Sequence, residues 1–112
     1  MLDLLFVYGT LRSEFDNRYA RRLRDEATFL RRTTMPGSIY RVEHYPAFRS
    51  QPEGEVQGEL YRLNTPEGTL AVLDEYEGDE FERVVVKGAW LYQYKGDPPE
   101  SARIASGDFC AP

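Results

Sequence analysis

Apolar positions along the chain fall into short clusters separated by polar residues, glycine and proline, which is typical of a protein built largely from short strands. Residues 4–8 form an apolar run of strand-forming residues that stops at Gly9, and they predict a buried first strand. Residues 27–34 and 37–42 predict two more strands. At residues 55–63, EVQGELYRL alternates without leaving either face purely polar, so we expect this strand to be covered on both sides.

Two segments have the spacing of amphipathic helices. In the first, Phe15, Tyr19 and Leu23 recur at every fourth position with arginines between them, which predicts a short amphipathic helix or a helical loop. Ser13 is placed to cap its start, because a serine oxygen accepts a hydrogen bond from the free amides of the first turn.

The second helical segment is expected to begin at Thr65-Pro66, because proline fits the first helical position and threonine can bond the free amides. Gly78 is placed to end it. Its buried stripe is expected to consist of Leu70, Leu73 and Tyr76, with Val72 beside them.

The remaining segments predict a loop and further strands. We expect a loop at residues 45–48, one long or bulged strand at residues 82–94 bent at Gly88, and a last short strand at residues 102–105. No repeat or linker divides the sequence, so we expect one domain spanning residues 1–112. Many strands with two helices indicate an α+β fold, for which a sheet curled into a barrel is one arrangement.

Composition and charge restrict the classes of function. Nineteen acidic and 14 basic residues give a net charge of -5, which disfavours binding to nucleic acid or to an anionic membrane. Cys110 is the only cysteine and His44 the only histidine, so we expect neither a disulfide nor a cysteine or histidine metal cluster. The sequence has no signal-peptide pattern and no apolar run of about 20 residues, so we expect a cytoplasmic protein.

The first candidate for chemistry is the segment YGTLR at residues 8–12, between the first strand and the first helical segment. A strand end followed by a turn can direct successive backbone amides at one anion, with Gly9 permitting the turn and Thr10 adding a hydroxyl. A strand that turns through Gly-Thr is also a routine loop, so spacing alone leaves both interpretations open. The segment is not a phosphate-binding Walker loop, because it lacks the second glycine and the Gly-Lys-Ser/Thr end.

The second candidate is the acidic run LDEYEGDEFER at residues 73–83. Glu77 falls at the C-terminal end of the second helical segment, where the helix dipole and the neighbouring acids disfavour an ionised carboxylate. Burial would raise its pKa further and make it a proton carrier near neutral pH. The other carboxylates of the run are expected to face water, and Tyr76 and Gly78 occupy positions that exclude an EF-hand.

Several motifs, taken in their order along the chain, resemble the γ-glutamylcyclotransferase-like family over residues 6–109. They are FVYGTLR near the N-terminus, HYPAF in mid-chain, the strand GELYRL, LDEYEG followed by FER, and a terminal SGDF. The length and the YGTLR loop are most similar to the AIG2-like branch that holds the small γ-glutamylamine cyclotransferases and bacterial proteins.

The resemblance implies a small, mostly antiparallel curled β-barrel with two or so peripheral helices and a cavity at one end. In family enzymes the loop equivalent to Tyr8, Gly9, Thr10 and Leu11 binds the α-carboxylate of a γ-glutamyl group, and the glutamate matching Glu77 is the catalytic acid and base. The substrate's own α-amine attacks its γ-carbonyl, which releases 5-oxoproline and an amine or amino acid. No metal or cofactor is implied.

We also assign Tyr45 to the cavity wall and Arg83 to a structural ion pair near the acidic turn. Phe81 and Phe109 stand where relatives often carry tyrosine and tryptophan, and both are expected to keep an aromatic wall.

Some bacterial relatives lack the catalytic acid, so a second hypothesis is a non-catalytic module that binds a small carboxylate or a peptide end. A third hypothesis is a structural interaction protein. The expected partner is a small γ-glutamyl compound with an unidentified leaving group, and the protein is expected to be a monomer or weak homodimer.

Overall fold

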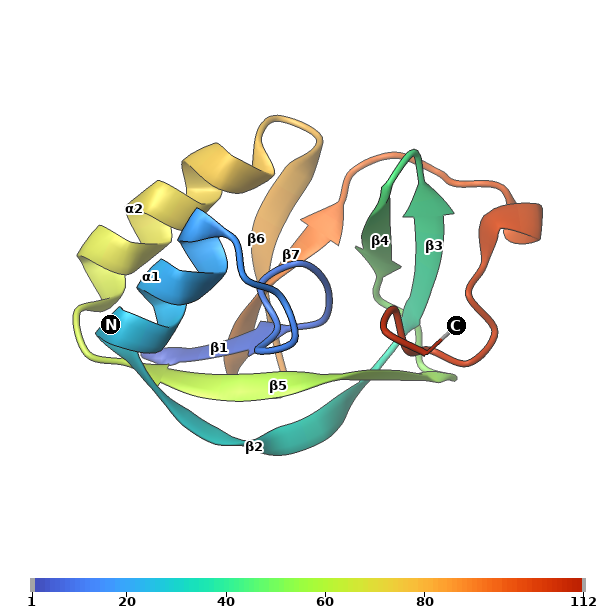
Figure 1. Cartoon of the computed structure of the whole chain (residues 1–112). Helices are drawn as coiled ribbons and strands as arrows, with labels where there is room; N and C mark the ends of the chain where they lie inside the picture. The colour runs from blue at the N-terminus through green and yellow to red at the C-terminus, as the bar shows by residue number, and fades with distance from the viewer. Residues whose placement is uncertain (1, 112) are drawn as a thin grey trace.

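A computed structural model describes residues 2–111 (Figure 1). In chain order its elements are β1 (Leu4–Val7), α1 (Arg18–Glu26), β2 (Ala27–Pro36), β3 (Ser38–Val42), β4 (Tyr45–Arg49), β5 (Glu55–Leu63), α2 (Pro66–Glu77), β6 (Phe81–Val86), β7 (Ala89–Tyr94) and the short helix η1 (Glu100–Ala102). Figure 1 shows α1 and α2 side by side over one part of the sheet, with the β3–β4 hairpin beside the other part. Neither α1 nor α2 has the length and apolar composition that crossing a bilayer would require.

Five strands form one mixed sheet in the order β2-β5-β1-β7-β6. β1 pairs antiparallel with β5 but parallel with β7, and the other pairs are antiparallel. Among residues 2–111 the hydrogen-bonded order begins at β2 and ends at β6, so the expected curled barrel is not confirmed. The small α+β fold with two α-helices is confirmed.

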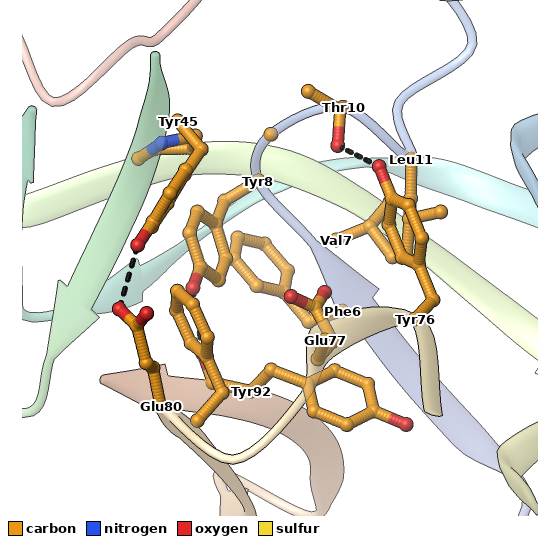
Figure 2. A pocket seen from close by; sticks show the side chains of 13 residues that line it. Phe6, Val7, Tyr8, Thr10, Leu11, Tyr45, Tyr76, Glu77, Glu80 and Tyr92 are labelled. Carbon is orange, nitrogen blue, oxygen red and sulfur yellow. Dashed lines mark hydrogen bonds between the residues drawn. The ribbon is translucent and has the colours of Figure 1, made fainter. Parts of the chain in front are cut away.

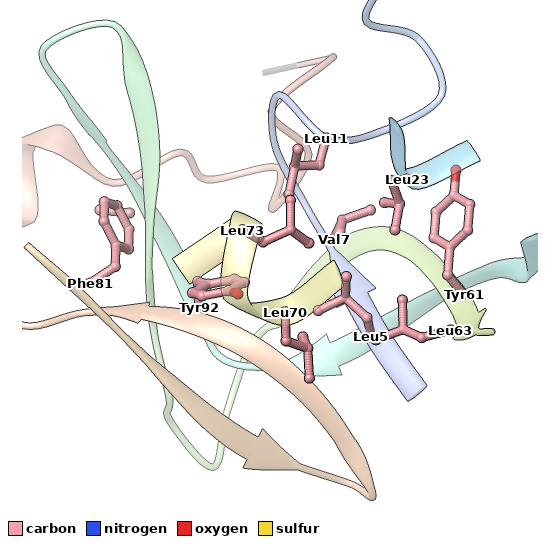
Figure 3. Packing of buried hydrophobic residues seen from close by; sticks show 11 residues of the cluster. Leu5, Val7, Leu11, Leu23, Tyr61, Leu63, Leu70, Leu73, Phe81 and Tyr92 are labelled. Atoms are coloured by element: carbon pink, nitrogen blue, oxygen red, sulfur yellow. The ribbon is translucent and has the colours of Figure 1, made fainter. Parts of the chain in front are cut away.

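The alternation of side chains along β1 places residues in a core on each face of the sheet. Leu5 and Val7 belong to the cluster under the helices, which Figure 3 shows around Leu70 and Leu73 of α2. Phe6 belongs to the second cluster, with residues of the β3–β4 hairpin. The segment that follows β1 therefore emerges where the two cores meet.

β3 and β4 form a separate two-stranded sheet, so the expected loop at residues 45–48 is wrong. Tyr45 pairs with Val42, and Pro46 pairs with Arg41. Proline has no amide to donate, but a two-stranded sheet leaves each strand an unpaired edge on which that loss is tolerated.

Side chains carry hydrogen bonds across the joint between the two sheets. The Tyr8 hydroxyl accepts from the amide of Phe48 in β4 at 3.3 Å and donates to the carbonyl of Tyr92 in β7 at 2.6 Å. Arg49 Nη1 donates to the main chain at the end of β7 at 2.8 Å, and Gln93 Oε1 accepts from the main chain after β4 at 2.8 Å.

Residues 82–94 form a hairpin rather than the expected single bent strand. Lys87 and Gly88 have φ values of 52° and 81° and connect β6 to β7. Two left-handed residues in succession match the right-handed twist of the flanking strands, which favours a tight hairpin turn.

The last short strand expected at residues 102–105 is also wrong. η1 ends at Ala102, and Arg103 forms only an isolated bridge with Tyr40. This segment nevertheless packs on β3, where the Ile104 amide donates to a main-chain carbonyl at 2.9 Å.

The helix starts differ in part from those expected. Asn17, not Ser13, is the N-cap of α1, and its side-chain oxygen accepts from the amides of Tyr19 at 3.1 Å and Ala20 at 2.8 Å. α2 begins at Pro66 as expected, although its N-cap residue makes no side-chain capping bond.

Ser13 is instead held by Glu59, a fully buried residue of β5. The two oxygens of the Glu59 carboxylate accept from the Ser13 amide at 2.7 Å and from its hydroxyl at 2.5 Å. The Tyr61 hydroxyl donates to the same carboxylate at 3.1 Å, and Arg32 Nη2 lies 3.7 Å from it. The strand β5, which pairs with β1, therefore fixes the end of the loop that follows β1.

Glu59→Gln is expected to lower the free energy of unfolding by about 2 kcal/mol, because a side-chain amide keeps one accepting oxygen and places its NH2 group against the other Ser13 donor, which is left unpaired. The same change at Glu82, which is exposed on β6, is the matched control and is expected to cost less than about 0.5 kcal/mol. Urea denaturation of the two variants measures the difference. If the two variants lose the same free energy of unfolding, the Ser13–Glu59 hydrogen bonds do not stabilise the fold.

Candidate active site

A cavity of about 310 Å³ lies at the end of β1, where the helices, the β3–β4 hairpin and β7 meet. Figure 2 shows it from close by. Its lining consists of Phe6, Val7, Tyr8, Gly9, Thr10, Leu11, Tyr45, Pro46, Tyr76, Glu77, Glu80, Phe81 and Tyr92. The cavity thus brings together every residue that the sequence analysis assigned to catalysis or substrate binding, while the roles assigned to them stay predictions.

Glu77 is the last residue of α2, which ends because Gly78 adopts a φ of 76°. Figure 2 shows the Glu77 carboxylate directed into the cavity beside the Phe6 ring. Among residues 2–111 it takes part in no hydrogen bond or ion pair. Burial raises the pKa of Glu77 to about 7, so the group exchanges its proton near neutral pH.

The loop after β1 contains a tight turn closed by a hydrogen bond from the Arg12 amide to the Gly9 carbonyl at 3.0 Å. Asn17 Nδ2 donates to the Thr10 carbonyl at 2.7 Å and holds the turn against α1. Within the described residues, no hydrogen bond uses the backbone amides of Gly9, Thr10 or Leu11. Successive amides left free in this way form the kind of concavity that binds anions.

Gly9 is required by close packing. A Cβ atom at this position would lie 2.5 Å from Cγ of Pro46 and 3.2 Å from its Cδ. The ring of Pro46 therefore supports the turn from the side of β4, and a side chain at position 9 would push the two apart.

Tyr8 forms part of the cavity wall with its hydroxyl already bonded. Its only hydroxyl proton goes to the Tyr92 carbonyl, so this group has no proton to offer a ligand in the present arrangement. Burial raises the pKa of Tyr8 well above its ordinary value, and the nearby Glu77 carboxylate adds to this. Tyr8 therefore stays neutral beside Glu77.

Thr10 and Tyr76 join the loop to α2. The two hydroxyl oxygens lie 2.7 Å apart in a hydrogen bond for which either is the donor. The Tyr76 ring stacks on that of Tyr19 in α1 at a centroid distance of 4.3 Å. The turn is thus fastened to the same helix that carries Glu77.

Tyr45 and Glu80 form another part of the wall. The Tyr45 hydroxyl donates to Glu80 Oε2 at 2.7 Å, and this bond, with burial second, raises the pKa of Tyr45 to about 12. Figure 2 shows this pair and the Thr10–Tyr76 pair on different sides of Glu77.

The expected ion pair of Arg83 is confirmed. Its Nε lies 3.0 Å from Asp74 Oδ1, and its guanidinium lies 4.3 Å from the centre of the Trp90 ring. Tyr92 donates its hydroxyl to the same carboxylate oxygen at 2.7 Å. Burial and this bond raise the pKa of Tyr92, so Asp74 positions both Arg83 and a wall residue of the cavity.

The two phenylalanines that stand where relatives often carry tyrosine and tryptophan lie in different places. Phe81 lines the cavity, whereas Phe109 lies outside its lining and stacks on Phe15 at a centroid distance of 6.1 Å. The expectation that Phe109 forms a cavity wall is therefore wrong. Within the part of the chain that the structure describes, no three or more His, Cys, Asp or Glu residues are grouped so as to hold a metal ion.

Sequence reasoning missed several residues of the cavity. The alternation of β1 could have placed Phe6 near the site, but Tyr76 was assigned to the helix core and Glu80 to the solvent. Tyr92 pairs with Arg83 in the β6–β7 hairpin. The sequence analysis expected a single strand there, in which these two residues are not neighbours, so it could not place Tyr92 near the cavity.

In this small α+β fold, a carboxylate whose pKa is raised to about 7 and the amides of Gly9, Thr10 and Leu11 line one cavity, which defines a candidate small-molecule site with the elements of acid–base chemistry. The family model described as "Gamma-glutamyl cyclotransferase, AIG2-like" matches residues 5–111. The chain belongs to this family. No curated protein matches it.

Solved structures share this fold. PH0828, an uncharacterized protein from Pyrococcus horikoshii, is 27% identical with a TM-score of 0.78 over 96% of this chain and 89% of that one. Escherichia coli ytfP is 29% identical with a TM-score of 0.70 over 96% of each chain. An AIG2-like protein (ggact) from Mus musculus is 23% identical with a TM-score of 0.70 over 88% of this chain and 80% of that one, which shows the fold alone.

Glu77→Gln is expected to stabilise the protein at high pH. A carboxyl group with a folded pKa of about 7 binds its proton more tightly in the folded than in the unfolded chain, so its contribution to stability falls as the pH rises toward 7. The variant is expected to gain about 2–3 kcal/mol over the wild type at about pH 8 and almost nothing at about pH 4. Urea denaturation at both pH values tests this, and a gain that does not depend on pH would contradict it.

Gly9→Ala is expected to lower the free energy of unfolding by about 1–3 kcal/mol, because its methyl group overlaps the Pro46 ring. Pro46→Ala removes the two ring atoms in conflict and leaves a Cβ 3.9 Å away, so the double variant should regain most of that loss. Denaturation of the four proteins measures the coupling. A Gly9→Ala loss of the same size with and without Pro46 would show that the contact is not responsible.

Proposed function

We propose that the protein is a γ-glutamyl cyclotransferase that releases 5-oxoproline from a γ-glutamyl amine or γ-glutamyl amino acid. One observation carries the proposal: Glu77, whose pKa is about 7, lines the same cavity as the unpaired amides of Gly9, Thr10 and Leu11. Membership of the family supports the class of reaction.

The amides of the turn would bind the α-carboxylate of the substrate. Free backbone donors beside the Thr10 hydroxyl suit a carboxylate, and no rearrangement of the turn is needed to supply them. The bonds of Thr10 to Tyr76 and to Asn17 keep the turn in place relative to α2. The α-carboxylate would thereby set the direction of the glutamyl arm toward Glu77.

Glu77 would move the proton of the reaction. Its carboxylate takes a proton from the α-ammonium, and the freed nitrogen attacks the γ-carbonyl carbon to form the ring carbon–nitrogen bond. The bond from that carbon to the leaving nitrogen then breaks as Glu77 returns the proton to this nitrogen. The ring nitrogen still carries one proton too many, which Glu77 takes up and passes to the released amine. The products are 5-oxoproline and the amine in its ammonium form, and Glu77 ends ionised as it began.

Orientation would supply much of the acceleration. Nucleophile and electrophile belong to one molecule, so the cavity has only to fold the glutamyl arm into attack geometry. Phe6, Tyr8 and Phe81 give the walls that confine it, and the neutral Tyr8 adds no charge to compete with Glu77. The proposed steps use groups of the substrate and of Glu77 alone.

Incubation of the wild type with a panel of γ-glutamyl amines and amino acids is expected to release 5-oxoproline, measured by mass spectrometry. Its kcat/KM should rise with pH through about 7, because only ionised Glu77 accepts the proton. Glu77→Gln should lower kcat by roughly 10²–10⁴-fold while substrate affinity is kept.

Glu82→Gln, on the exposed side of β6, is the control with the same change of charge and should keep full activity. Absence of 5-oxoproline across the whole panel would overturn the proposal. A γ-glutamyl compound that raises the melting temperature without being consumed would identify the protein as a binding module instead.

A further inference from the structure

The charges that line the cavity are all of one sign. Glu77 and Glu80 are its only ionisable carboxylates, and no lysine, arginine or histidine is among its lining residues. A ligand with two negative charges could place one on the free amides of the turn, but the second would meet no cation on the walls. The lining therefore restricts which γ-glutamyl compounds fit.

Glu80 differs from Glu77 in its surroundings. It is exposed at the edge of the cavity, and its Oε2 accepts from the Tyr45 hydroxyl at 2.7 Å. Within residues 2–111 it forms no salt bridge. One oxygen of the carboxylate is thus directed by Tyr45, and the other is left for a ligand.

The position of Glu80 is set by the fold. Its carbonyl accepts from the Lys95 amide at 2.8 Å, which ties the turn before β6 to the end of β7. The next residue, Phe81, packs on the Tyr45 ring at a centroid distance of 5.7 Å. The carboxylate of Glu80 is therefore presented by main-chain and aromatic contacts, and this arrangement does not depend on a ligand.

The amide turn and the Tyr45–Glu80 pair lie on different sides of Glu77 in Figure 2. If the α-carboxylate occupies the turn and the γ-carbonyl lies at Glu77, the group beyond the γ-carbonyl extends toward the remaining wall, which Tyr45 and Glu80 form. That group is the leaving amine.

Resting on the proposed function, we propose that the preferred leaving group is an amine bearing a second positive charge, as in a diamine or polyamine, and that Glu80 binds this charge. Tyr45 acts as the positioning residue for Glu80. An amino acid leaving group places its carboxylate against a wall without cations, and an uncharged alkylamine leaves Glu80 without a partner.

Three γ-glutamyl conjugates of similar length test this preference: those of diaminobutane, pentylamine and aminobutyrate, whose far ends are positive, neutral and negative. For the wild type we expect kcat/KM to be about 5-fold higher for the diaminobutane conjugate than for the pentylamine conjugate, which is the upper range for an exposed ion pair. The aminobutyrate conjugate is expected to be the poorest of the three. The preference should weaken as salt increases.

Glu80→Gln keeps an acceptor for Tyr45 and removes only the charge, so it should abolish the preference by raising KM for the diaminobutane conjugate. Glu82→Gln removes a charge outside the cavity and should retain the preference. Calorimetric binding of the same conjugates to Glu77→Gln gives a readout that does not need turnover, and the diaminobutane conjugate should again bind most tightly.

The outcomes separate the two proposals. If none of the conjugates yields 5-oxoproline but the diaminobutane conjugate binds most tightly through Glu80, the cyclotransferase proposal fails and the cation subsite stands. If the conjugates react or bind equally well, or if Glu80→Gln keeps the wild-type preference, the subsite is wrong whether or not the protein is a cyclotransferase.

Discussion

The geometry of the cavity depends on one buried carboxylate, that of Glu59 at the centre of β5. Taking a carboxylate out of water is unfavourable unless donors surround it, and Ser13 and Tyr61 supply them. The same bonds fix the far end of the loop that follows β1. Arg12, next to Ser13, is also buried and lies 2.8 Å from Asp108, so the loop is held from the C-terminal segment as well. With these anchors in place, the turn needs none of its own central amides to keep its shape, and they remain free for a ligand.

The local elements were largely predictable because they depend on neighbouring residues. The apolar run of β1, the proline start and glycine end of α2 and the alternation of β5 all specify structure within a few residues. The failures occurred where tertiary pairing decides. Pro46 argues for a loop until β3 is known to lie beside it, and the turn at Lys87-Gly88 depends on a left-handed lysine that no local rule demands.

The candidate site shows the same division between local and long-range information. The YGTL turn and Glu77 were selected separately and then joined through a family resemblance, because no periodic pattern relates residues so far apart in the sequence. The reason given for the raised pKa of Glu77 also changed. The sequence suggested the helix end and crowding by acids first, with burial adding to them, whereas burial is the cause that the structure gives. Burial of one side chain is a property of the whole fold, which explains why Glu80, three residues later, stays exposed.

The cavity lies at the joint between two sheets, and the bonds of Tyr8, Arg49 and Gln93 cross that joint. The amide turn and Glu77 belong to the five-stranded sheet and its helices, whereas Tyr45 and Pro46 belong to the hairpin. A change in the angle between the sheets would therefore resize the cavity while the distance between the proton carrier and the amide turn stayed the same. Replacements in the hairpin, which supplies Tyr45 and Pro46 to the wall, would therefore alter what the cavity accepts without moving Glu77 relative to the amide turn.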